Sequence, residues 1–151
     1  MELRPLRKGD VEALSSWLPD AASSIGCERF ASENPLRGAI GVSDLLVAVE
    51  DEPAGVLQCE IGSPSPDAAR VRVLLVAPER RRLGIGGRAA LGLERRLAKK
   101  AKRIYVAVPS ELGLALYFWL RLGYRPLTQA EWPAPPERPP ATWMVRELGP
   151  P

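Results

Sequence analysis

The chain has no histidine and only two cysteines, Cys27 and Cys59. Without histidine it cannot form a Ser-His-Asp triad, a Cys-His pair or a histidine-based zinc site. It also lacks the side chain that normally titrates near neutral pH. Acid–base chemistry would therefore fall to a carboxylate with a shifted pKa, a tyrosine, a lysine, water or the substrate. Two cysteines are too few for a disulfide framework and are interpreted as buried thiols of a cytoplasmic protein.

Long apolar runs are also missing from the sequence. The longest runs are short and interrupted by charged residues, so we expect neither a signal peptide nor a membrane-spanning helix. Hydrophobic residues nevertheless make up 46% of the 151 positions. This composition predicts one compact domain over residues 1–151 with a core of its own.

Positive charge is concentrated in one part of the chain. The formal net charge is +3, but residues 80–103 contain ten Arg or Lys and a single acid, Glu94. The cations at 99–103 would stabilise the C-terminal end of a helix, an explanation that needs no partner. A basic face that binds nucleic acid is the alternative. It is disfavoured because no aromatic residues are interleaved with the charges for base stacking.

One stretch of the sequence predicts a site for an anion. An apolar strand at residues 71–76 is followed by Pro78, which cannot donate to a ladder and ends the strand. Three arginines follow at 80–82, then glycines at 84, 86 and 87, and a helix over residues 85–101. Unpaired first-turn amides, the positive end of the helix dipole and the arginines together suit a diphosphate held mainly by backbone.

Two other phosphate-binding motifs fit this stretch less well. Gly84-Ile-Gly86-Gly-Arg-Ala89 formally matches the G-x-G-x-x-[GA] fingerprint of dinucleotide-binding folds. That fold requires an acid near the end of the next strand and a second mononucleotide half. The next strand, at residues 104–108, contains no acid, and too few residues follow the glycines. A P-loop is excluded because no Gly-Lys-[Ser/Thr] follows them.

The segment Arg81-Arg-Leu-Gly84-Ile-Gly86 is an R-x-x-G-x-G sequence between an apolar strand and a long amphipathic helix. It resembles the acyl-CoA-binding motif of the GNAT superfamily of N-acetyltransferases. The resemblance covers nearly the whole chain, and its parts occur in the family's order. The other parts are Leu3 to Asp10, Val76-Ala-Pro78-Glu, Ile104-x-Val106-x-Val108, and the helix and turn from Ala115 to Gly123-Tyr124.

The resemblance implies an α/β (α+β) fold. Its central sheet would be mixed and mostly antiparallel, with about six to seven strands, helices on both faces and a splayed parallel strand pair. It also implies transfer of an acetyl group from acetyl-CoA, as co-substrate and without a metal, to a primary amine that attacks directly in a ternary complex. The implied partners are acetyl-CoA and the amine, with no membrane. Exposed strand edges make a homodimer reasonable.

The implied acetyl-CoA site lies on the strand, the glycine-containing loop and one later helix. Arg81 carries the motif position, whereas Arg80 and Arg82 are expected to be exposed. Backbone N–H groups near Val76 would stabilise the oxyanion. The residues implied to bind the cofactor are Leu74, Leu75, Val76, Arg81, Arg82, Leu83, Gly84, Ile85, Gly86, Gly87, Arg88 and Trp119.

Two positions depart from the family's pattern. Trp119 stands where the family has the tyrosine that acts as general acid. Leu112 stands where the family has an asparagine at the start of a helix. Tyr117 is the candidate general acid, with an aromatic packed in the core as the alternative. Glu60 is the candidate general base, with a solvated edge glutamate as the alternative. The departures also leave open a non-catalytic acyl-CoA-binding module.

The rest of the pattern predicts alternating strands and helices. Asp10 is a candidate N-cap for a helix over 11–18 that ends at Pro19, and residues 21–37 are expected to be a weak helix or a loop. A second helix is expected over 111–122, ended by Gly123. Loops are expected at 62–67 and 132–140. The expected strands are 3–6, 45–49, 54–61, 69–76, 104–108, a strand beginning at 124, and 141–148.

Overall fold

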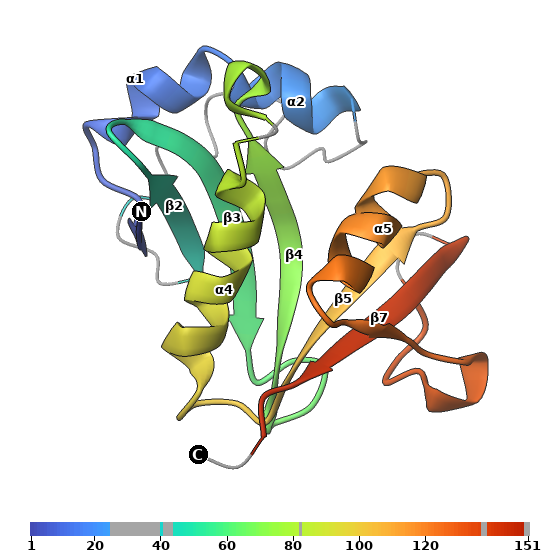
Figure 1. Ribbon diagram of the computed structural model, residues 1–151. Coiled ribbons are helices and arrows are strands. Elements are labelled where there is room, and N and C mark those ends of the chain that lie inside the picture. The colour runs from blue at the N-terminus through green and yellow to red at the C-terminus, as the bar shows by residue number, and fades with distance from the viewer. Residues whose placement is uncertain (25–39, 41–43, 82, 137–138, 150–151) are drawn as a thin grey trace. The chain divides into compact units, whose positions relative to one another are not determined.

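The computed structural model describes residues 1–24, 40, 44–81, 83–136 and 139–149. In these residues seven strands form one sheet in the order β1-β2-β3-β4-β5-β7-β6 (Figure 1). The predicted mixed sheet, mostly antiparallel with one parallel pair, is confirmed. The strands are β1 (Glu2–Pro5), β2 (Leu45–Val49), β3 (Pro53–Ile61), β4 (Ala68–Val76), β5 (Arg103–Pro109), β6 (Arg125–Pro126) and β7 (Ala141–Glu147).

The helices lie between these strands in the chain. They are α1 (Asp10–Ser15), α2 (Leu18–Ser24), α4 (Ile85–Leu97) and α5 (Gly113–Arg121), with 3-10 turns η2 (Pro78–Arg80) and η3 (Gln129–Glu131). Contacts divide the chain into a first unit, Met1–Cys59 with Val73–Leu93, and a second unit, Glu60–Arg72 with Glu94–Pro151. The single domain predicted over residues 1–151 stays a prediction.

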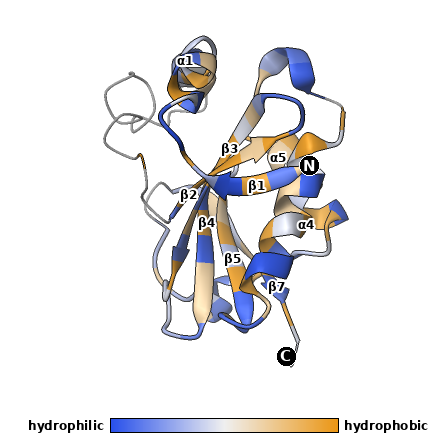
Figure 2. Ribbon diagram, turned by 90° about the vertical axis from the view of Figure 1, so that its left-hand side faces the viewer, coloured by the Kyte–Doolittle hydropathy of each residue, from blue (hydrophilic) through white to orange (hydrophobic). Residues whose placement is uncertain are grey.

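In the first unit, helices lie on both sides of the antiparallel strands. Leu45–Val49 is buried along nearly its whole length, as a strand covered on both faces must be. Leu14 of α1 and Leu18 of α2 pack with Val47 and Val56 in one core cluster. Figure 2 shows α1 and α4 on opposite sides of these strands. The strands expected at 45–49 and 54–61 are present and pair as an antiparallel hairpin, with Leu46 opposite Leu57.

The first helix differs from the prediction at both ends. Asp10 is not the N-cap: the cap residue is Gly9, and Asp10 is the first residue of α1. The helix ends at Ser15, and Pro19 lies in the first turn of α2 instead of ending a helix over 11–18. A proline is tolerated there because first-turn N–H groups have no intrahelical acceptor. Of the predicted weak helix or loop, residues 25–37 lie outside the described part.

The long helix begins at Ile85 as predicted but ends at Leu97 and not at Ala101. The N–H groups of Lys100 and Ala101 both donate to the carbonyl of Leu97, at 2.8 and 3.0 Å. This tightened last turn satisfies the carbonyl without continuing the helix. Three exposed cations, Lys99, Lys100 and Lys102, therefore lie just past the helix end.

The second unit contains the parallel pair. Ala68–Val71 of β4 pair in parallel with Arg103–Val106 of β5, and β5 pairs with β7 in antiparallel fashion along its length. Trp143 is fully buried, and Tyr105 meets it edge to face at 5.9 Å between ring centroids. The predicted end of α5 is confirmed, because Gly123 follows it at φ +93°, a conformation that favours glycine.

Candidate functional site

The connection from β4 to α4 lies in the first unit and has its own backbone supports. Ala77, the residue after the strand, donates its N–H to the carbonyl of Ala54 on β3 at 2.8 Å. Pro78 then opens η2, and the N–H of Arg80 donates back to Ala77 at 2.9 Å. The strand therefore ends where proline predicts it, and the turn begins from a fixed point. Figure 1 shows η2 beyond the arrowhead of β4.

The start of α4 presents unpaired donors. Gly84 has φ +78°, which non-glycine residues rarely adopt. The first helical hydrogen bond runs from the N–H of Arg88 to the carbonyl of Gly84 at 3.0 Å. The amides of Ile85, Gly86 and Gly87 therefore precede the helical ladder, and the first turn carries no acidic residue. This is the backbone arrangement that favours an anion.

The three strand residues predicted to line the cofactor differ in their exposure. Leu75 is buried and packs in the core cluster of the first unit, so its side chain is not exposed to a ligand. Leu74 and Val76 are half-buried and alternate with it along the strand. A contact between the backbone of Leu75 and the cofactor stays a prediction. Leu83 is 58% exposed, whereas the side chain of Ile85 is buried.

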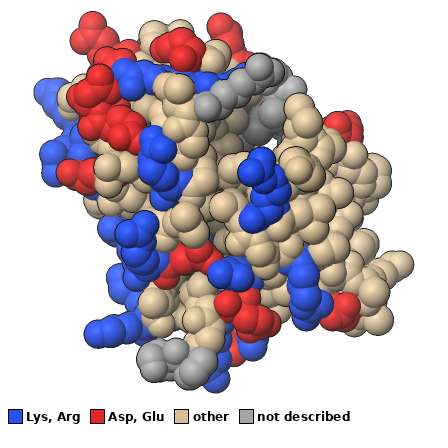
Figure 3. Space-filling view, in the orientation of Figure 1, with Lys and Arg blue, Asp and Glu red and all other residues tan. Residues whose placement is uncertain are grey.

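Arg80 and Arg88 are tied to carboxylates of the β2–β3 turn. Arg80 donates to Asp51 at 2.8 Å and to Glu52 at 2.7 Å, and the Arg80 hydrogen bond holds the pKa of the Asp51 carboxyl below its usual range. Arg88 donates through Nε to Glu50 at 3.0 Å. The expectation that Arg80 is simply exposed is therefore wrong. Figure 3 shows acidic and basic side chains interleaved over this end of the first unit.

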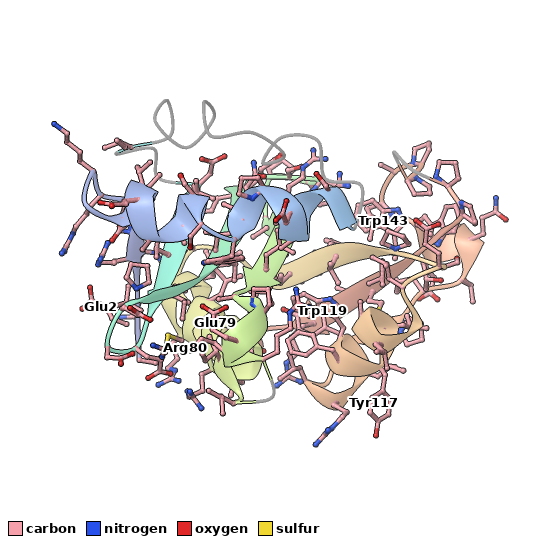
Figure 4. The ribbon with its side chains drawn as sticks, turned by 90° about the horizontal axis from the view of Figure 1, so that it is seen from above. Glu2, Glu79, Arg80, Tyr117, Trp119 and Trp143 are labelled. Atoms are coloured by element: carbon pink, nitrogen blue, oxygen red, sulfur yellow. The ribbon has the colours of Figure 1, made fainter. Side chains whose placement is uncertain are left out.

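Arg81 has a different environment. It is exposed, and its Nε donates to the carbonyl of Val76 at 3.4 Å, a long hydrogen bond. Its guanidinium has no carboxylate partner within the described residues. In Figure 4 Arg80 lies beside Glu79 at the same end of the unit. Arg82, predicted as a cofactor contact, lies outside the described part of the chain.

The acidic turn is the component that sequence reasoning missed. Glu50, Asp51 and Glu52 follow one another directly after β2, where the local pattern indicates only a hairpin turn. An acidic triplet and an arginine triplet in one short chain are a signal for ion pairing. Their separation of 28 residues between Glu52 and Arg80 hides that pairing from any local pattern.

The two aromatic residues considered on α5 lie on different sides of that helix. Trp119 is buried and meets Tyr124 at 4.8 Å and Phe118 at 5.0 Å between ring centroids. Tyr117 is 60% exposed, with the Arg121 guanidinium 5.8 Å from its ring centroid. Figure 4 shows Tyr117 pointing outward. The alternative of Tyr117 as a core aromatic is therefore wrong, and its role as an acid stays a prediction.

Glu60, the candidate base, is paired with a neighbouring strand. Both of its oxygens accept from the Arg72 guanidinium, through Nε and, at 3.4 Å, through Nη2. The carboxylate is half-buried, so it is not the fully solvated edge glutamate of the alternative. Glu60 as general base stays a prediction.

The start of α5 lacks a polar cap. Leu112 is the N-cap, and no side chain bonds the first-turn amides. At the position where the family has an asparagine, this chain therefore has an apolar residue, and that residue does begin a helix. Among the described residues, no three His, Cys, Asp or Glu side chains gather as metal ligands. In the same residues, no helix has the length and apolarity needed to cross a membrane.

Comparisons with known proteins agree with this geometry. A model of the acetyltransferase (GNAT) family matches residues 12–124. No curated protein shows significant sequence similarity to the chain.

Solved structures share the fold. An acetyltransferase from Thermus thermophilus is 21% identical, with a TM-score of 0.72 over 97% of this chain and 96% of that one. The PaiA N-acetyltransferase from Thermoplasma acidophilum, in complex with coenzyme A, is 17% identical, with a TM-score of 0.74 over 97% and 98%. The ribosomal-protein-S18-alanine N-acetyltransferase from Escherichia coli is 18% identical, with a TM-score of 0.69 over 97% and 93%. Because the family model matches residues 12–124, most of the sequence, the chain belongs to the acetyltransferase (GNAT) family.

Proposed function

We propose that the protein transfers an acetyl group from acetyl-CoA to a primary amine of a small molecule, peptide or protein. The observation that carries the proposal is the start of α4, where Gly84 turns the chain and leaves first-turn amides without intrahelical partners. The PaiA enzyme, which shares the fold, was solved in complex with coenzyme A. The pyrophosphate of that cofactor is the anion that such a helix start suits.

In this proposal most hydrogen bonds to the pyrophosphate come from backbone N–H groups at the start of α4. Arg80 and Arg88 are committed to Asp51, Glu52 and Glu50, which cancels their charge locally. Of the three arginines described around this loop, Arg80, Arg81 and Arg88, Arg81 is the one without an ion pair to a described residue. We therefore assign Arg81 a direct contact with the phosphates and the glycines close backbone approach.

The proposed reaction is a direct attack of the amine on the thioester, with one proton lost and one gained. The neutral amine nitrogen attacks the thioester carbonyl carbon, the C–S bond breaks, and the sulfur leaves with the electron pair. The amine loses one proton and the thiolate gains one, so the step balances without another reactant. Tyr117 is the proposed source of the proton and Glu60 the proposed acceptor. Because Glu60 is paired with Arg72, water is its competitor for that role.

Acetyl-CoA binding is tested by thermal unfolding. At a ligand concentration of about 100 times Kd, the free energy of unfolding rises by ~2.7 kcal/mol, which corresponds to a Tm increase of about 5–10 °C. Arg81→Glu is expected to weaken binding at least ~10-fold because it reverses the charge beside the phosphates. Arg96→Glu, an exposed position on α4 with the same change of charge, is the control. Equal shifts in both variants would contradict the site.

Turnover is tested separately with a panel of amines, by following release of coenzyme A. Tyr117→Phe and Glu60→Gln are each expected to lower kcat by about 10- to 100-fold if they act as acid and base. An unchanged kcat in both variants would leave positioning and water as the only contributions.

A non-catalytic acyl-CoA-binding module is the second candidate. It is favoured by Leu112 and Trp119, which stand at two positions where the family has polar groups. Binding of acetyl-CoA without release of coenzyme A on any amine would support this candidate over the enzyme.

A further inference from the structure

Arg88 joins three segments of the first unit. Its Nε and Nη2 both donate to Oε1 of Glu50, at 3.0 and 2.5 Å, and its Nη1 donates to the carbonyl of Leu83 at 3.0 Å. Glu50 immediately follows β2, Leu83 precedes the helix start, and Arg88 itself ends the first turn of α4. One guanidinium therefore connects the hairpin, the loop and the helix.

The same side chain lies across Gly84. A Cβ placed on Gly84 would come within 3.0 Å of Nη1 of Arg88. Gly84 is also the residue at φ +78°, and its carbonyl accepts the first helical hydrogen bond from the Arg88 N–H. The conformation that exposes the first-turn amides is thus held on both sides by Arg88, through its backbone and through its guanidinium.

We propose that Glu50 and Arg88 are a positioning pair for the pyrophosphate loop. Glu50 fixes the guanidinium, the guanidinium fixes the Leu83 carbonyl and the turn at Gly84, and the amides of residues 85–87 are kept open. This inference rests on the proposed function, because it concerns the same loop. The resemblance implied that Arg88 contacts the cofactor. The inference instead gives Arg88 a contact with the loop backbone.

If Glu50 acts only through its charge, its removal should tighten the binding of coenzyme A, whereas a positioning role predicts weaker binding. A carboxylate close to a bound diphosphate repels it, so its removal would tighten coenzyme A binding if charge were its only effect. Loss of a positioning contact weakens binding instead, because a loosened loop must be ordered again by the ligand. The sign of the change therefore separates the two explanations. A partly exposed ion pair contributes little to global stability, so Tm of the ligand-free protein should hardly change.

The test measures the Kd of coenzyme A by titration calorimetry for the wild type, Glu50→Gln, Arg88→Ala and the double variant. Each single variant is expected to bind about 10-fold more weakly, and the double variant no more weakly than either single one, because each removes one charge of the same ion pair. Arg88→Lys, which keeps the charge and loses the planar fork, is expected to behave as Arg88→Ala does. Additive losses, wild-type binding by Arg88→Lys, or tighter binding by Glu50→Gln would overturn the proposal.

Glu79→Gln is the matched control. Glu79 is an exposed acid on η2 with no ion pair among the described residues, and its removal changes the charge by the same amount. It is expected to leave the Kd unchanged or to tighten binding slightly. A 10-fold loss in this variant would show a general effect of charge and overturn the pairing.

A second measurement keeps the inference independent of the ligand. Amide hydrogen exchange of residues 83–88 in the ligand-free protein is expected to be faster in Glu50→Gln and Arg88→Ala than in the wild type and Glu79→Gln. Unchanged exchange would overturn the positioning role. If the wild type itself ignores coenzyme A while exchange still accelerates, the proposed function fails and the positioning of the loop stands.

Discussion

The N-terminal ends of α1 and α4, both in the first unit, differ in whether a carboxylate lies near the positive end of the helix dipole. At α1 the first turn contains Asp10, whose Oδ2 accepts from the N–H of Arg7 at 2.8 Å, and both of whose oxygens accept from Arg4. At α4 the first turn contains no acid and two glycines. The first start is neutralised by the chain's own carboxylate. The second has no carboxylate in its first turn, which is what the proposed binding of a diphosphate requires.

The start of α5 shows that an open first turn is not sufficient. It too lacks an acidic residue and a polar cap, but its basic residue, Arg121, lies in the last turn. The residue before it, Leu112, has φ −101°, so the chain enters the helix without a left-handed turn. What distinguishes the start of α4 is therefore the combination of Gly84, Arg81 three residues before it, and Arg88, which is paired with Glu50.

The largest expected effect comes from giving α4 the carboxylate that α1 already has. Gly87→Glu places an acid in the first turn, where it stabilises the helix and repels a diphosphate. Coenzyme A binding is expected to weaken about 100-fold or more, equivalent to ~2.7 kcal/mol, while Tm of the ligand-free protein stays equal or rises. Gly113→Glu, the same change at the first turn of α5, is expected to leave binding unchanged. Equal losses at both glycines, measured by calorimetry, would break the comparison.

The next effect removes the carboxylate from α1. Asp10 is 4% exposed, and the hydrogen bond from Arg4 holds its pKa below the usual range. Asp10→Asn is expected to lower the free energy of unfolding by about 1.5–3 kcal/mol at pH 7. Because the folded-state pKa is depressed, this contribution is complete above the unfolded-state value of about 3.9 and is lost as the pH falls below it.

Urea unfolding of wild type and Asp10→Asn at pH 7 and pH 3 measures this contribution. The difference between the two proteins should be largest at pH 7 and should shrink at pH 3. A difference that is the same at both pH values would mean that Asp10 stabilises α1 by packing and not by its charge.

The sequence predicted the connection around α4 because each residue there acts through its own backbone. Pro78 ends a strand by lacking a donor, and Gly84 allows a left-handed turn. Proline was ambiguous at Pro19, because it ends one helix and equally begins another. Only the packing of Leu18 in the core cluster decides between these.

The orientation of α5 could not be predicted because nearly every residue of that helix is apolar. Tyr117 and Trp119 are separated by about 200° around the helix axis, so they cannot both face the core. The sheet selects Trp119, which is buried. The pairing of Glu50 with Arg88 was hidden for a related reason, since it joins residues 38 positions apart through the folded chain. Patterns of neighbouring residues report local conformation, and they do not report which distant side chain completes a site.

The smallest expected effect comes from comparing Gly84, which precedes α4, with Gly113, the first residue of α5. Gly84→Ala forces a side chain into the left-handed region, costing about 1–2 kcal/mol, and it crowds Arg88 Nη1. Gly113→Ala meets nothing within 4 Å and is expected to change stability by less than ~1 kcal/mol, in the stabilising direction. Chemical denaturation gives both values. If Gly84→Ala were as stable as the wild type, the left-handed turn would not be the feature that opens the first-turn amides of α4, and the contrast with α5 would rest on Arg81 and Arg88 alone.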